Sequence, residues 1–242
     1  MKNSPVFKIC FSGLLLALII IFTRFLSLQN IPVLPFVRIS FGPGLIIFAS
    51  LFLGPIYGGA IGGLSDILGI VLVPSALGYG INPWFTLVYT FLGVLPWCLL
   101  KLFNIIKNKK ISFAIFLAVF ISLLTFGNIY LFVGNNFGSV SLDIATKIII
   151  SISSIVLSIL TICLIVLINK KYESLNVLNF AIISLISEVI MMTILNSIVK
   201  SIFFGTEFFV IFFFQVIALF INVPMNTFLL SFLFKTVNRI AK

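Results

Sequence analysis

Residues 38–86 read RISFGPGLIIFASLFLGPIYGGAIGGLSDILGIVLVPSALGYGINPWFT, and this stretch decides the fold. It is apolar enough to lie in a bilayer, yet it begins with Arg38 and contains Asp66. Gly-Pro steps divide it into short helical pieces. Broken helices that carry a few ionisable groups are typical of small-molecule sites in membrane proteins. We therefore expect the functional site in this stretch.

The composition of the whole chain points to a membrane protein. Of its 242 residues, 62% are hydrophobic and only 8% are charged, which is typical of a polytopic membrane protein. The first apolar run could belong to a signal peptide, but it continues to Leu26 without a clear small-residue cleavage site. We therefore interpret it as a retained first transmembrane helix.

The apolar pattern predicts an all-α polytopic membrane protein with about eight transmembrane segments in a single domain, residues 1–242. The segments are 8–28, 38–53, 55–73, 84–101, 112–133, 143–168, 178–203 and 208–234. The second and third are short and are separated only by Gly54-Pro55, which predicts a tight helical hairpin. Most of the 15 Lys and Arg residues fall on one side when both termini are cytoplasmic, as the positive-inside rule requires.

Several function classes lack the residues that they need. The sequence has no histidine, no GxxxxGK[ST] loop, and three cysteines in separate segments, so we expect no metal site and no cofactor. The net charge of +10 follows the topology rather than a basic patch on a soluble module, so we expect no nucleic-acid partner. Nucleophile–base pairs are scarce, which argues against an enzyme.

Two ionisable residues are the main candidates for a binding site. Arg38 could extend to lipid headgroups, or its guanidinium could pair bidentately with a ligand carboxylate. Asp66 lies at membrane depth, where an aspartate costs about 2.5–3.5 kcal/mol on insertion scales. It should therefore pair inside the protein, with Arg38 as one candidate, or face a cavity and accept hydrogen bonds from an amidine-like ring edge.

Aromatic and polar residues near the outer ends of the helices are further candidates. Tyr79 and Trp84 could be ordinary interface-belt aromatics, or they could form an aromatic lid over a flat ligand. Asn196 and Gln215 lie in the outer half and are candidates for lining a cavity. The deeper polar residues Glu188, Asn222 and Asn226 are expected to pack against one another.

Small residues predict two close helix contacts. Gly58, Gly59, Gly62 and Gly63 form GGAIGG, which favours packing of the third helix within the protein over a partner interface. Gly13 and Ala17 form a similar pair low on the first helix, where a partner subunit is as plausible as packing within the chain.

The motifs RISFGP, GPIYGGAIGGLSDILG and NPWFT resemble those of the folate-type substrate-binding (S) subunits of energy-coupling-factor (ECF) vitamin transporters. The resemblance covers residues 8–101 closely, and it resumes in residues 178–242, which are similar to the last two helices of that family. Because the family usually has six helices, residues 112–170 are expected to be an inserted helical pair. An even number of inserted helices preserves the topology.

The resemblance implies a multi-pass protein of the bacterial cytoplasmic membrane that captures a folate-like vitamin from outside. A membrane coupling protein and two ATPase subunits would drive uptake with ATP, and the Gly13/Ala17 face would meet the coupling protein. The implied substrate-binding residues are Arg38, Ser40, Phe41, Asp66, Tyr79, Asn82, Trp84, Phe85, Thr86, Asn196 and Gln215.

The chain departs from the family pattern at a few positions. Trp84 replaces the glycine of a typical PGFT, and Gln215 and Ala218 stand where basic residues are common. These departures leave open another flat vitamin or precursor as the ligand. A non-catalytic membrane scaffold is the alternative from a different class.

Overall fold

The computed structural model describes residues 4–31, 34–73, 80–103, 109–133, 143–172 and 175–240. Its helices are α1 (Pro5–Ile20), α2 (Gly42–Leu53), α3 (Pro55–Leu72), α4 (Pro83–Phe103), α5 (Lys109–Val133), α6 (Ile144–Lys171), α7 (Val177–Ser187), α8 (Asn196–Phe204) and α9 (Phe208–Ile240). Two π-helical segments, η1 (Ile21–Phe25) and η2 (Glu188–Leu195), extend α1 and join α7 to α8. Strands β1 (Leu28–Ile31) and β2 (Leu34–Ile39) complete the described elements.

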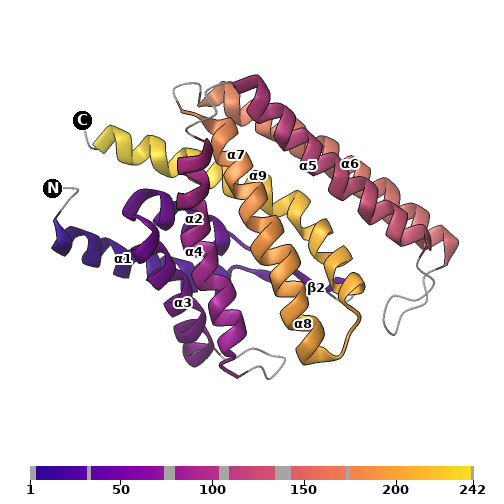
Figure 1. The fold of residues 1–242 in the computed structure, drawn as a ribbon, viewed down its shortest axis with the longest axis horizontal. Coiled ribbons are helices and arrows are strands. Elements are labelled where there is room, and N and C mark those ends of the chain that lie inside the picture. The colour runs from indigo at the N-terminus through magenta and orange to yellow at the C-terminus, as the bar shows by residue number, and fades with distance from the viewer. Residues whose placement is uncertain are drawn as a thin grey trace.

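The structure confirms an all-α polytopic membrane protein. Among the described residues, seven helical spans are long and apolar enough to cross a membrane, and α7, η2 and α8 together form one of them. The remaining predicted segment, residues 38–53, corresponds to α2, a shorter apolar helix. The start of α1 and the end of α9 lie on the same side of the molecule (Figure 1), as two cytoplasmic termini require.

One part of the chain differs from the sequence-based expectation. The segment between the first two helices, expected to be a loop, forms an antiparallel hairpin in which Gln29 lies opposite Arg38. Val37 and Ile39 are β-branched and favour an extended backbone. The second helix consequently begins at Gly42 rather than at residue 38, with Pro43 in its first turn, where a missing N–H costs nothing.

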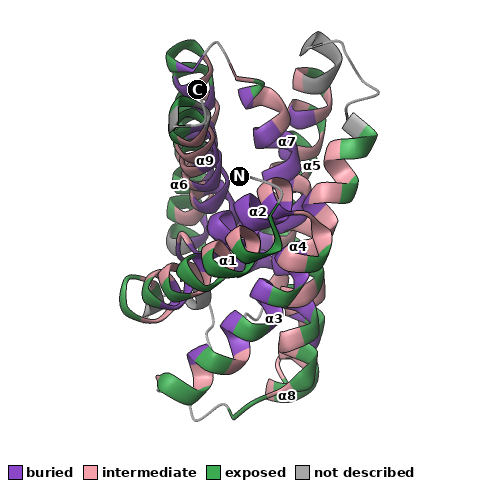
Figure 2. Cartoon of the chain, turned by 90° about the vertical axis from the view of Figure 1, so that its left-hand side faces the viewer, coloured by how far each residue is buried: buried purple, intermediate pink, exposed green. Residues whose placement is uncertain are grey.

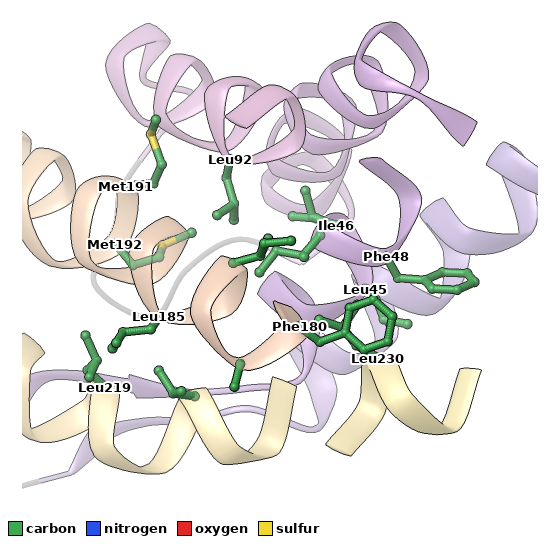
Figure 3. Close-up of a cluster of buried hydrophobic side chains, with 14 of the residues drawn as sticks. Leu45, Ile46, Phe48, Leu92, Phe180, Leu185, Met191, Met192, Leu219 and Leu230 are labelled. Carbon is green, nitrogen blue, oxygen red and sulfur yellow. The ribbon is translucent and has the colours of Figure 1, made fainter. Parts of the chain in front are cut away.

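Helix α2 lies at the centre of the bundle. Figure 2 shows it buried between α1, α4, α7 and α9. Its side chains Leu45, Ile46 and Phe48 belong to the main hydrophobic core, where they meet Leu92 of α4 and Phe180 of α7 (Figure 3). The helix ends at Gly54, whose φ of 101° allows the turn into α3 that the Gly-Pro step predicted.

The glycines of α3 bring this helix against α4. A Cβ added at Gly58 would strike the carbonyl of Gly93, and one at Gly62 would strike the carbonyl of Tyr89. At Gly63 it would lie 2.6 Å from the Thr90 hydroxyl oxygen. The GGAIGG motif therefore serves packing within the chain, as predicted.

The two helices of residues 112–170 form a hairpin on one flank of the molecule. Helices α5 and α6 run side by side, away from α1 and α3 (Figure 1). They pack against α7 and α9 through buried residues such as Phe116, Phe120 and Ile165. Among the described residues, the main contacts between the hairpin and the rest of the bundle are therefore those with α7 and α9.

Candidate functional site

Asp66 pairs with Arg24, at the outer end of the first span. The distance from Arg24 Nη2 to Asp66 Oδ1 is 3.8 Å, and the same nitrogen lies 3.4 Å from the Asp66 carbonyl oxygen. Both side chains are largely shielded, with 9% and 7% of their surfaces exposed. The π-helical η1 turn carries Arg24 to this position, and such turns are frequent at functional sites.

Arg38 reaches the same region from β2. Its guanidinium donates to the Thr23 carbonyl, and the Tyr89 hydroxyl lies 3.5 Å from Nη1. Its backbone carbonyl accepts a 3.2 Å hydrogen bond from the Asn222 amide of α9. The charge of Arg38 also acts on Arg24 and Asp66, so two guanidiniums and one carboxylate share one electrostatic environment. Arg38 is therefore not the direct partner of Asp66, although the sequence suggested it as one candidate.

The two guanidiniums are incompletely satisfied. The Nε atoms of Arg24 and Arg38 are buried and have no hydrogen-bond partner. A tight guanidinium–carboxylate pair has N···O distances of about 2.7–2.9 Å, whereas the Arg24–Asp66 pair is much looser. Buried N–H groups without acceptors are costly, and a bound acceptor would remove that cost. Guanidinium groups with unused N–H donors are chemically suited to an anion.

Arg24 is the functional candidate that the sequence analysis missed. A Cβ at Gly69 would lie 2.6 Å from Arg24 Nε, so Gly69 leaves the space that this guanidinium fills. The sequence does contain a signal for this pair. Arg24 lies at the outer end of one apolar run, and Asp66, followed three residues later by Gly69, lies in another. Because the two runs are far apart in the sequence, their pairing could not be read from spacing.

Asp66 also connects to the start of α4. The Thr86 hydroxyl donates a 2.9 Å hydrogen bond to Asp66 Oδ2. One turn earlier, the Asn82 side-chain oxygen accepts from the Trp84 backbone N–H at 3.0 Å, which fixes the helix entry. The Trp84 ring itself is 59% exposed. The structure thus brings Thr86 and Asp66 together and places Trp84 at the rim of this helix end.

The remaining predicted site residues lie on several different elements. Ser40 is buried at the end of β2, and Phe41 packs its ring against Phe22, with centroids 5.6 Å apart. Phe85 lies 6.3 Å from the Phe203 ring of α8. Asn196 is half-buried at the start of α8, and Gln215 is buried on α9. Tyr79 lies outside the described residues.

Two of the three deeper polar residues pack together, as expected, whereas the Asn222 side-chain amide donates to the Arg38 carbonyl instead. Asn226 donates a 2.7 Å hydrogen bond to Glu188 Oε1, and both side chains are buried. The Asn226 side-chain oxygen faces Gly44 of α2, where an added Cβ would lie 2.6 Å from it. This pair joins η2 to α9 next to α2.

The small-residue pair of α1 lies on an open face. Gly13 and Ala17 are exposed, and a Cβ at Gly13 would meet no atom within 4 Å. Figure 2 shows α1 on the outside of the bundle with much of its length exposed. Among the described residues, no three His, Cys, Asp or Glu side chains gather into a potential metal site.

Comparison with known proteins identifies one relevant similarity. The chain is 29% identical over 121 residues to "Folate transporter FolT" of Clostridium novyi (strain NT). The match spans 50% of this chain and 66% of that relative, slightly less than two thirds. No protein-family model matches the chain, and no solved structure matches it. The apolar spans and this similarity indicate a multi-pass bacterial membrane protein, and they agree with the resemblance to folate-type S subunits carried by the motifs of residues 38–86.

Proposed function

We propose that the chain is the substrate-binding subunit of an ECF-type transporter and captures a folate-like vitamin from outside the cell. The motifs between Arg38 and Thr86 and the similarity to a folate transporter support this function. The structure adds a buried group of charges in the same part of the chain.

The observation that carries the proposal is the pair of arginines with unpartnered Nε–H groups. Arg24 and Arg38 bring two positive charges to a site with one nearby carboxylate, Asp66. Guanidinium groups bind carboxylates bidentately, and such charge-assisted bonds are about twice as strong as neutral ones. The glutamate end of folate carries two carboxylates and matches this excess of positive charge.

Other residues are assigned to the flat part of the ligand. Asp66 would accept hydrogen bonds from the heterocycle edge, because Thr86 occupies only part of the capacity of its two oxygens. Tyr79, Trp84 and Phe85 would stack on rings. The polar contacts are assigned to Ser40, Asn82, Thr86, Asn196 and Gln215, and a further aromatic contact to Phe41.

The energy for uptake would come from partner subunits. The sequence holds no P-loop, so ATP hydrolysis is assigned to two ATPase subunits linked through a membrane coupling protein. The exposed Gly13/Ala17 face of α1 is the proposed contact for that coupling protein, because small residues let helices approach closely.

A second candidate is the same kind of subunit with a different flat vitamin. Trp84, Gln215 and Ala218 depart from the folate-type pattern, and Gln215 and Ala218 are both buried on α9. Neutral or small side chains there would suit a ligand with less charge. Competition by a panel of vitamins separates the two candidates.

The proposal is tested by titrating the purified protein with folate and recording tryptophan fluorescence. Trp84 is the reporter, and Trp97 lies about 20 Å further along α4 as background. We expect saturable quenching that is abolished in Arg38→Ala and Asp66→Ala. Arg239→Ala and Asp143→Ala are matched controls, because both residues are exposed and remote in sequence from the site.

Wild-type affinity in both Arg38→Ala and Asp66→Ala would refute the residue assignment. A response to another vitamin and none to folate would favour the second candidate. No response to any vitamin in the panel would favour a scaffold.

A further inference from the structure

Pro224 interrupts the backbone hydrogen bonds of α9. Proline has no N–H, so the carbonyl four residues earlier, that of Phe220, loses its usual helical donor. Inside a membrane protein an unsatisfied carbonyl is costly, and Ser or Thr side chains or neighbouring helices can supply the missing donor.

The hairpin formed by α5 and α6 supplies this donor. The Thr161 hydroxyl of α6 lies 2.5 Å from the Phe220 carbonyl oxygen, and Thr161 is 1% exposed. The same hydroxyl is 2.8 Å from the carbonyl of Leu157 in its own helix. A hydroxyl carries one proton, and the Leu157 carbonyl already has the Thr161 backbone N–H as its helical donor. The proton therefore satisfies Phe220, the nearer oxygen and the one that lacks a helical donor.

Both helices of the hairpin converge on Phe220. The Phe120 ring of α5 meets the Phe220 ring edge to face, with centroids 4.9 Å apart. One residue of α9 is thus held by α5 through its side chain and by α6 through its backbone. This contact lies directly before Pro224, where the helix is weakest.

The opposite face of α9 lies next to the arginine site, by which we mean Arg24, Arg38, Asp66 and Thr86. Asn222 follows Phe220 by two residues, which is about 200° around the helix. Its side-chain amide donates to the Arg38 carbonyl at 3.2 Å, and α9 packs along β2. Helix α9 therefore lies between Thr161 on one side and the backbone of Arg38 on the other.

We infer that Thr161 is a positioning residue for the substrate site. The α5–α6 hairpin supplies the hydrogen-bond donor that α9 lacks because of Pro224. By satisfying the Phe220 carbonyl, Thr161 holds this turn of α9 in place, so that Asn222 keeps Arg38 where its guanidinium meets the ligand. The effect on the ligand rests on the proposed function, whereas the effect on α9 does not.

The test is a double-mutant cycle between Thr161 and Pro224, with folate as the probe. Thr161→Val removes the hydroxyl but keeps the shape, and Pro224→Ala restores a backbone N–H for Phe220. We expect Thr161→Val to lower the melting temperature and to weaken folate binding about two- to tenfold, as the loss of one hydrogen bond predicts. In the Pro224→Ala background, Thr161→Val should change neither quantity.

Two further variants sharpen the result. Thr161→Ser keeps the hydroxyl and should bind folate as the wild type does. Thr125→Val removes a hydroxyl of the same hairpin that bonds only within its own helix and should leave affinity unchanged.

Equal losses from Thr161→Val with and without Pro224 would overturn the inference, because the hydroxyl would then not be filling the gap at Pro224. A lower melting temperature with unchanged affinity would reduce Thr161 to a purely structural residue. If the wild type does not bind folate, the proposed function fails, but the melting temperatures of the same four proteins still decide whether Thr161 replaces the missing N–H.

Discussion

At the scale of single residues, the site depends on how the buried charge of Asp66 is stabilised inside the membrane. Asp66 is buried and accepts from Thr86, and its loose pairing with Arg24 offsets the charge without consuming the guanidinium. A tight bidentate pair would have used two of the five N–H donors of Arg24 and left fewer for a ligand. In this arrangement the buried Nε–H groups of Arg24 and Arg38 have no hydrogen-bond partner.

Replacement of either partner by leucine should destabilise the protein more than replacement of both. Arg24→Leu or Asp66→Leu leaves one buried charge without its counter-ion, which should lower the free energy of unfolding by about 1–3 kcal/mol or more. The double variant should recover most of that loss, because an apolar pair often replaces a buried ion pair without cost. Thermal unfolding in detergent measures all three, and none of them should bind folate.

Additive losses in the double variant would show that the two side chains do not act as a pair. Thr86→Val provides a comparison, since it removes only the hydrogen bond that the Thr86 hydroxyl donates to the Asp66 carboxylate. It should cost about 1.5–3 kcal/mol, because the acceptor is charged.

At the scale of helices, the position of α3 against α4 sets the geometry of the site. The two helices touch at backbone distance through Gly58 and Gly62, and they carry Asp66 and Thr86 respectively. A shift of one helix would therefore change the hydrogen bond between these side chains.

Gly62→Ala should separate α3 from α4. The added methyl group would collide with the Tyr89 carbonyl, a backbone atom that cannot turn aside. Although alanine is about 1 kcal/mol better than glycine in a helix, we expect a lower melting temperature and weaker folate binding. The control is Gly13→Ala, where nothing lies within 4 Å of the new methyl group, and its stability should be unchanged or slightly higher. Unchanged stability in Gly62→Ala would contradict the close contact.

The sequence predicted the helices well because their signals are local. Length, apolar content and the Gly54-Pro55 step placed each span, and GGAIGG predicted the close packing of α3. The β-hairpin before α2 was missed, since its strands are short and joined by a segment that also suits a loop. The partner of Asp66 was missed because Arg24 reaches it only after α1 and α3 pack, and the proposed ligand contacts stay predictions.

At the scale of the whole molecule, each part of the chain has a distinct place around the arginine site. The first span brings Arg24, β2 brings Arg38, and α3 and α4 bring Asp66 and Thr86. Helix α9 holds β2 through Asn222. The α5–α6 hairpin contacts α9 through Thr161, and one face of α1 is exposed.

The central claim is that the two arginines hold the acidic end of the ligand. The most direct measurement compares, in wild-type protein, the affinity for folate with that for its bis-amide, in which both glutamate carboxylates are neutral carboxamides of the same size. Charge-assisted hydrogen bonds contribute about 1.5–3 kcal/mol each, so folate should bind at least about tenfold more tightly. This preference should become smaller in Arg38→Gln, which retains Arg24. Equal affinity for the two ligands in the wild type would contradict the account.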